Sequence, residues 1–250
     1  MRVETGDRLM IGGFIITGNV SKKVVIRGLG PSLAGFGITD FLVDPTLELR
    51  SSTGTLPQQN DNWKDTQRAE IEATGLQPSD DRESALVATL VPGNYTALLT
   101  GKGGTTGVGT VEVYDVNIAG DSQLANLSTR GFVQTGNDVM IAGFTLGNGS
   151  NPTDIAVRGI GPSLSNVGLS NVLADPTLEL RNSNGTLLVS NDDWQSDPVS
   201  AGKLTVHGLA LSNSKESGIY TTMPPGQFTA ILAGKDGGIG IALIEVYRVQ

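Results

Sequence analysis

The sequence predicts an all-β protein made of two tandem, homologous, jelly-roll-like β-sandwich domains, each with one short helix. Three observations predict this class. The 250-residue chain repeats itself at a spacing of 130 to 133 residues, it holds 34 glycines but only 5% aromatic residues, and its apolar runs are short and end in turn residues. Many tight turns between short strands are typical of sandwiches and barrels.

The internal repeat sets the domain organisation. The stretch "GDRLMIGGFII" (6–16) returns as "GNDVMIAGFTL" (136–146). Solenoid units are about 20 to 50 residues long, so this much longer period gives each copy a core of its own. We predict a first repeat at 1–119 and a second at 120–250, joined within "NIAGDSQLA" (117–125).

The strands follow from period-two alternation, which is clearest in "TLELR" (46–50) and "VEVY" (111–114). Turn residues separate the runs. "SSTG" and "NSNG" favour hairpins in which Gly54 and Gly185 take a positive φ, and "PGNY" and "PGQF" favour Pro-Gly turns between two strands. We expect seven or eight strands in each copy.

One segment departs from the strand pattern. Residues 65–76, "DTQRAEIEATGL", predict a short helix with Asp65 as its N-cap and Gly75 as its stop. A weaker counterpart is expected at 198–207.

The two copies differ at their starts. "LANLSTRG" (124–131) precedes the second copy, whereas the first begins at Met1 with no equivalent. Either a preceding strand belongs to a longer parent protein, or the first domain has a sheet edge that something else completes.

Charge and residue types exclude several functions. Seventeen basic residues against 25 acidic ones give a net charge of −8, which disfavours nucleic-acid partners. With no cysteine and one histidine, His207, thiolate and multi-histidine metal sites are excluded, so any metal is a hard cation held by oxygens. No apolar run approaches the roughly 18 residues of a membrane span, so we expect no membrane insertion.

The recurring stretch "RGLGPSL" (27–33 and 158–164) raises the question of catalysis, because glycines and a serine follow a strand. It lacks the G-x-S-x-G of a nucleophile elbow and the lysine of a phosphate loop. We therefore predict a structural corner in which the glycines allow a sharp bend: Gly28, Gly30, Gly159 and Gly161.

The arginine that opens this stretch also recurs. We predict that Arg27 and Arg158 form structural ion pairs with a recurring acid, such as Glu48/Glu179 or Glu83/Glu216, in preference to an anion site.

Two loops, "NDNWKD" (60–65) and "NDDWQSD" (191–197), are candidate calcium sites because they alternate oxygen-bearing side chains. The bland alternative is that these residues cap turns and the helix. Each loop also holds a tryptophan that either forms a ligand-binding face or closes the core. The candidates are Asp61, Asp65, Asp192 and Asp193 for calcium, and Trp63 and Trp194 for a ligand.

The succession "DPTLELRNSNGTLLVSNDDW" (175–194), "ESGIYTTMPPGQFTAILAG" (216–234) and "IALIEVY" (241–247), matched in the first copy, resembles the bacterial pre-peptidase C-terminal (PPC-like) domain. Each copy is also similar to a tandem C-terminal repeat of large secreted bacterial proteins. The resemblance implies a non-catalytic β-sandwich, sometimes calcium-stabilised and sometimes binding protein or polysaccharide.

We therefore expect a non-catalytic, extracellular or cell-surface structural or interaction protein, in its sharpest form a filament subunit that self-associates by strand addition. The alternative is a carbohydrate- or matrix-protein-binding accessory module of an exported enzyme. A hydrolase using Asp80, Asp81 and Glu83 is the weakest interpretation, because only Glu83 recurs, as Glu216.

Overall fold

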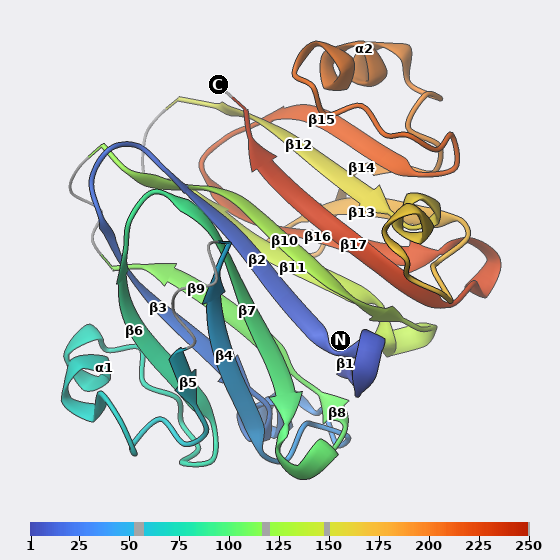
Figure 1. Ribbon diagram of the computed structural model, residues 1–250. Helices are drawn as coiled ribbons and strands as arrows, with labels where there is room; N and C mark the ends of the chain where they lie inside the picture. The colour runs from blue at the N-terminus through green and yellow to red at the C-terminus, as the bar shows by residue number, and fades with distance from the viewer. Residues whose placement is uncertain (53–57, 117–120, 148–150, 250) are drawn as a thin grey trace. The chain divides into compact units, whose positions relative to one another are not determined.

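The chain forms two compact units, Arg2–Leu127 and Ser128–Gln250, with Met1 assigned to the latter. We call them the N-terminal and C-terminal units. The computed structural model describes residues 1–52, 58–116, 121–147 and 151–249 (Figure 1). The unit boundary falls within strand β10 (Gln123–Val133), eight residues beyond the predicted 119/120. Part of the predicted joint, 117–120, lies outside the described residues.

The N-terminal unit is built of antiparallel strands. One sheet has the order β2-β7-β4-β5, a second has β6-β3-β9, and β1 pairs with β8. The bounds are β1 Arg2–Val3, β2 Met10–Thr17, β3 Lys22–Leu29, β4 Pro45–Ser51, β5 Gln58–Asn60, β6 Ser84–Leu90, β7 Gly93–Gly101, β8 Gly107–Val108 and β9 Thr110–Asp115, with helix α1 at Arg68–Thr74.

The C-terminal unit repeats this plan. Its sheets have the orders β11-β16-β13-β14 and β15-β12-β17-β10. The bounds are β11 Met140–Leu146, β12 Thr153–Ile160, β13 Pro176–Asn182, β14 Leu187–Asn191, β15 Ser217–Met223, β16 Gly226–Gly234 and β17 Gly240–Arg248, with helix α2 at Pro198–Val206. The predicted all-β class is confirmed.

Short 3-10 helices join several strands. They span Gly6–Arg8, Pro31–Phe36, Lys102–Gly104, Gly136–Asp138, Pro162–Val167 and Lys235–Gly237.

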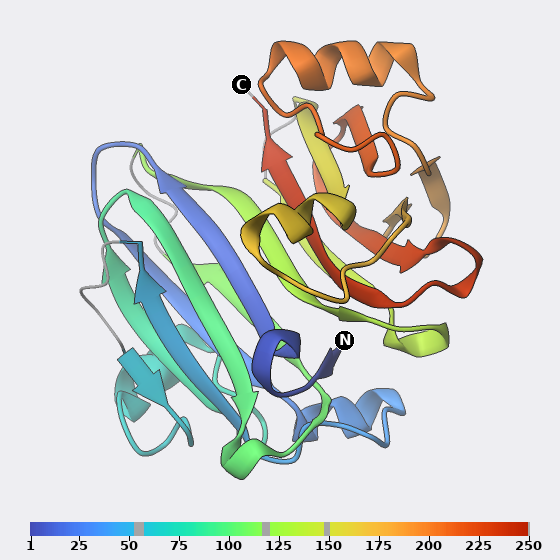
Figure 2. The ribbon, with the colours of Figure 1, turned by 45° about the vertical axis from the view of Figure 1, so that its right-hand side comes forward.

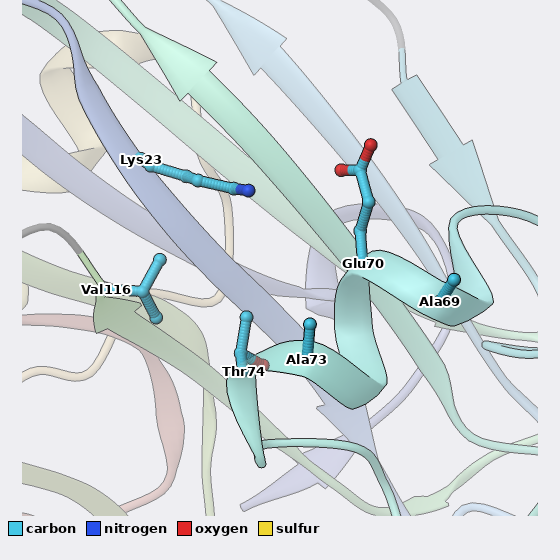
Figure 3. Close-up of a pocket in the computed structure, with 6 residues that line it drawn as sticks. All are labelled: Lys23, Ala69, Glu70, Ala73, Thr74 and Val116. Carbon is cyan, nitrogen blue, oxygen red and sulfur yellow. The ribbon is translucent and has the colours of Figure 1, made fainter.

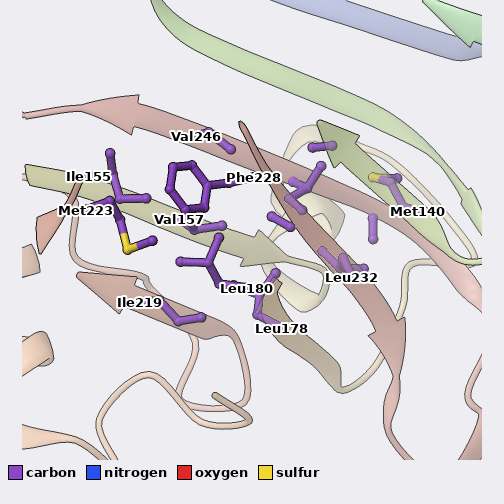
Figure 4. Packing of buried hydrophobic residues seen from close by; sticks show 14 of the residues in the cluster. Met140, Ile155, Val157, Leu178, Leu180, Ile219, Met223, Phe228, Leu232 and Val246 are labelled. Carbon is purple, nitrogen blue, oxygen red and sulfur yellow. The ribbon is translucent and has the colours of Figure 1, made fainter. Parts of the chain in front are cut away.

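Alternation of apolar residues places a core between the two sheets of each unit. In the C-terminal unit β13 buries Leu178 and Leu180 against Val157 of β12 and Phe228 of β16 (Figure 4). The N-terminal core is built at equivalent positions, with Leu47 and Leu49 as the counterparts of the two leucines. On β4 the intervening Glu48 is only half-buried, as period two requires.

The two helices lie beside the strands that follow them, α1 by β6 and α2 by β15 (Figures 1 and 2). Helix α1 stops before Gly75 as predicted, and this C-cap glycine is left-handed, but the N-cap is Gln67 and not Asp65. Helix α2 is the longer one, contrary to prediction, because Pro198 starts it and the Asp197 side chain accepts two amides of its first turn.

The predicted turns appear where they are described. Gly185 has φ +78° in the turn between β13 and β14, and the predicted counterpart Gly54 lies outside the described residues. No helix of the described residues is long and apolar enough to cross a membrane.

Candidate functional site

The repeated corner is closed by a buried glutamate. The amide of Gly30, the amide of Ser32 and the Ser32 hydroxyl donate to one oxygen of Glu83, at 3.0, 2.9 and 2.6 Å. Glu83 is fully buried. A carboxylate away from water depends on such donors, so this contact fixes the exit of β3 into the following 3-10 helix.

The second copy has the same contact. The amides of Gly161 and Ser163 donate to Glu216 at 3.3 and 3.0 Å, and the Ser163 hydroxyl donates to the same oxygen. Both serine hydroxyls are thus hydrogen-bonded to carboxylates within the corner. His207 stacks on Tyr220 of β15 instead, so it does not serve Ser163 as a base.

The corner glycines are required by close approach of neighbouring groups. A β-carbon at Gly30 would lie 1.9 Å from the carbonyl oxygen of Leu42, and one at Gly161 would lie 2.2 Å from that of Leu173. At Gly28 it would lie 2.6 Å from a methyl carbon of Leu99. At Gly159 it would lie 3.1 Å from side-chain carbons of Leu178 and Leu232, a milder crowding.

The corner arginines pair with a different acid from the ones predicted. Arg27 donates to Glu112 at 2.7 Å and to the Leu76 carbonyl at 3.0 Å, and its guanidinium lies 5.0 Å from the ring centre of Tyr114. The predicted ion pair with a recurring acid is present, but the acid is Glu112 and not Glu48 or Glu83. Arg27 and Glu112 are opposite each other in the β3–β9 register, which places both side chains on one face.

The second copy repeats this arrangement. Arg158 donates to Glu245 at 2.9 Å, its opposite residue on β17, and not to the predicted Glu179 or Glu216. Burial and then the charge of Glu245 raise the pKa of Tyr247 to about 12. The recurring "EVY" on the last strand was the signal that sequence reasoning missed.

The tryptophans do not form an exposed binding face. Trp63 and Trp194 are only 4% and 7% exposed, and each packs with apolar residues of its helix and the adjacent strands. The predicted ligand-binding role is therefore corrected: both rings are core residues, because a large apolar ring gains more from burial than from a wet loop.

The candidate calcium residues divide between the units. Asp192 and Asp193 each place an oxygen within 4.8 Å of one another and of Asp175. In the N-terminal unit, Asp61 pairs with Lys102 at 2.5 Å, as Asp192 pairs with Lys235 in the C-terminal unit. Asp65 accepts the Asn62 side chain at 2.9 Å.

Buried carboxylate oxygens without a hydrogen-bond partner single out one further aspartate beside the candidate calcium loop of each copy. One oxygen each of Asp44, Asp61, Asp175 and Asp192 is buried without a hydrogen-bond partner among the described residues. Asp44 and Asp175 open the repeated "DPTLELR", a position that sequence reasoning passed over. Carboxylate oxygens of this kind fit a hard cation, although Lys215 and Lys235 already pair with Asp175 and Asp192.

The acids considered for hydrolysis are used otherwise. Asp80 binds Arg82 at 2.8 Å, Asp81 pairs with Lys64 at 2.5 Å, and Glu83 holds the corner. Hydrogen bonds from Arg82 lower the pKa of Asp80, which is the opposite of what a general acid needs.

A surface depression lies beside the helix of each unit. In the N-terminal unit Lys23 and Glu70 project at its rim from β3 and α1 (Figure 3). In the C-terminal unit the corresponding depression includes Asp154, which accepts the Tyr220 hydroxyl at 2.9 Å. Hydrogen bonds from Thr222 and then Tyr220 lower the pKa of Asp154. The polar groups differ between the copies, so they make no shared site.

Comparisons with known proteins add no assignment. No family model matches the chain, and no curated protein matches it. One similar solved structure is the crystal structure of the STIV MCP, with 14% identity and a TM-score of 0.25, covering 99% of this chain and 93% of that one. Another is the atomic structure of Sulfolobus Turreted Icosahedral Virus, with 13% identity and a TM-score of 0.27, covering 99% of this chain and 88% of that one. A third is the infectious bursal disease virus VP2 subviral particle, with 8% identity and a TM-score of 0.19, covering 99% of this chain and 70% of that one.

Proposed function

We propose that this protein is a non-catalytic structural protein of the bacterial cell surface or exterior that self-associates by strand addition. The observation that carries the proposal is a difference between the two copies. In the C-terminal unit β17 lies between β12 and β10, whereas in the N-terminal unit its counterpart β9 ends the sheet order β6-β3-β9 among the described residues.

Burial of side chains follows this difference. Ile244 and Val246 of β17 are buried, at 0% and 6% exposure, whereas their counterparts Val111 and Val113 on β9 are half-buried. An open edge with unfinished burial is a template for pairing with another strand. Strand β9, "TVEVYD", also lacks the proline and lysine that commonly protect free edges.

The absence of catalysis in the proposal is supported by how the polar residues are used. At the corners, Ser32 donates to Glu83 and Ser163 donates to Glu216. Asp80 and Asp81 pair with basic side chains. Placement outside the cell is supported by composition, since abundant Thr, Ser, Asn and Gly with an acidic balance resemble secreted bacterial β-proteins.

Calcium is proposed as a stabilising ion of the C-terminal unit, held by Asp175, Asp192 and Asp193. The same position in the N-terminal unit has Asn62 in place of Asp193. A ligand-binding module remains a weaker alternative, because burial of Trp63 and Trp194 removes the feature that favoured it.

Light scattering and electron microscopy of the purified chain test self-association. We expect species larger than the 26.0 kDa chain that grow with concentration. A monodisperse monomer over the whole accessible concentration range would overturn the proposal.

A further inference from the structure

The depressions beside the two helices hold charges that are left out of the ion pairs of the chain. Among the residues that the structure describes, five of the seven lysines form ion pairs. The two that form none are Lys23, in the depression beside α1, and Lys203, in the depression beside α2. Glu70, across from Lys23 on the same depression, also has no ion pair within the described part of the chain (Figure 3). The unpaired lysines are thus confined to two equivalent surfaces.

The repeat places opposite charges at equivalent positions of these surfaces. Lys23 aligns with Asp154, and Glu70 aligns with Lys203. In both units the amide of a valine just after the last strand donates to the carbonyl of the first of these residues, at 3.1 Å for Lys23 and 2.9 Å for Asp154. One depression is therefore basic on its strand and acidic on its helix, and the other has the reverse arrangement.

The apolar side chains of the two depressions also differ in a complementary way. Val199 and Val206 of α2 are 72% and 82% exposed. They are seven residues apart, which is about two helical turns, so they lie on one face of the helix. The depression beside α1 has the smaller Ala69 and Ala73, and Ala73 aligns with Val206. Two exposed valines on one helix face form a patch that small side chains can accommodate.

The charges of the C-terminal depression are held in place by a tyrosine. The ammonium nitrogen of Lys203 lies 4.9 Å from the ring centre of Tyr220. The hydroxyl of the same tyrosine donates to Asp154 at 2.9 Å. Because both charged groups are already positioned, a partner that pairs with them loses less conformational entropy on binding.

We propose, on the basis of the self-association put forward above, that the depression beside α1 of one copy binds the depression beside α2 of a second copy. Lys23 then lies opposite Asp154 of the second copy, and Glu70 lies opposite its Lys203. An approximate two-fold axis along the line between Lys23 and Glu70 brings both pairs together, because equivalent residues on such an axis face each other. Two like depressions paired in this way would set lysine against lysine and glutamate against glutamate.

This contact joins two different surfaces, and each chain carries one of each. Such a heterologous interface leaves one surface open at either end of a pair, so further copies add head to tail. The exposed charges select the partner surface, and the apolar side chains between them contribute buried area.

The test exchanges the charges of the two helices in separate chains. Glu70→Lys and Lys203→Glu both change exposed helix positions whose side chains make no hydrogen bond within the described residues. Each variant alone sets like charges against each other, so we expect its self-association, followed by light scattering, to be weaker by roughly tenfold or more. An equimolar mixture of the two variants should regain native assembly, because contacts between unlike chains again pair opposite charges.

The matched control is Glu72→Lys, which makes the same charge change on α1 but does not line the depression. It should assemble like the native chain. Single variants that assemble as strongly as the native chain, or a mixture that stays dissociated, overturn this interface and leave self-association standing. If only Glu70→Lys is impaired, two α1 depressions pair with each other and the assignment of the partner surface is wrong.

Amide exchange of β9 separates this interface from strand addition. Strand addition slows the exchange of β9 amides on assembly. Assembly that the charge variants abolish and the mixture restores, without slower exchange at β9, would keep this interface and refute strand addition. A native chain that stays monomeric at every concentration refutes the proposed function and this interface together.

Discussion

Glu83 accepts the hydroxyl of Ser32 at 2.6 Å across 51 residues of sequence. The same oxygen also holds two backbone amides. We therefore expect Glu83→Met to destabilise the N-terminal unit by about 3 kcal/mol, because it leaves three buried donors without an acceptor. Urea unfolding measures the loss. Glu70→Met, on the exposed face of α1, is the control and should change stability by less than about 0.5 kcal/mol. Equal effects of the two variants would contradict a role for the buried contact.

The glycine at the corner gives a second prediction. Gly30→Ala should destabilise by roughly 3 kcal/mol, since its β-carbon would meet the Leu42 carbonyl, which is backbone and cannot rotate away. Gly35→Ala lies in the same 3-10 helix with no atom within 4 Å and should be close to neutral. Both are read by thermal melting. A Gly30→Ala variant as stable as Gly35→Ala would mean that the corner tolerates a side chain.

Tyr247 predicts a pH dependence of the C-terminal unit. Its folded pKa is raised to about 12 from 10.0, so the neutral phenol favours the folded state. This contribution is complete below pH 10 and is lost as the pH rises toward 12. Burial also raises the pKa of Tyr95, Tyr114 and Tyr220 above the ordinary value of 10.0. Tyrosinate absorbance should therefore titrate late as a whole, and Tyr247→Phe should remove one group that titrates near pH 12. Titration of all four tyrosines near pH 10 would refute the shift.

Calcium should act on one unit and not on both. The C-terminal unit has three carboxylates together, whereas Asn62 replaces one of them in the N-terminal unit. We expect calcium to raise the melting temperature of the C-terminal unit, by an amount set by the ratio of its concentration to Kd. Because each unit holds one tryptophan, fluorescence of Trp63→Phe and Trp194→Phe variants reports the units separately.

The same loops supply matched variants for this experiment. Asp193→Asn should abolish the calcium effect in the C-terminal unit, and Asn62→Asp should introduce one in the N-terminal unit. If chelator leaves both melting temperatures unchanged, these aspartates serve only the turns.

The sequence was sufficient for the fold because its signals were local or repeated. Alternation in "TLELR" predicted β4 and β13, and Gly75 marked the end of α1. The N-cap was misassigned because Asp65 lies three residues before the helix, where its side chain accepts from Asn62 instead.

Long-range pairing was the part that sequence could not supply. The partner of Arg27 depends on the register between β3 and β9, which are 85 residues apart at this pair. Several acids recur in the repeat, so recurrence alone did not distinguish Glu112 from Glu48 or Glu83. The burial of Trp63 likewise depends on where α1 packs, which no local pattern specifies.

The glutamate corner exists twice in one polypeptide, and this makes the molecule its own reference. A substitution at Glu83 can be compared with its twin at Glu216 in the same solution, with the untouched copy reporting any change in conditions. The two copies share the corner serine, glycines and glutamate, whereas the equivalent loop position is Asn62 in one copy and Asp193 in the other. The duplicated domains thus share the corner that determines their shape and differ in the residues of their loops.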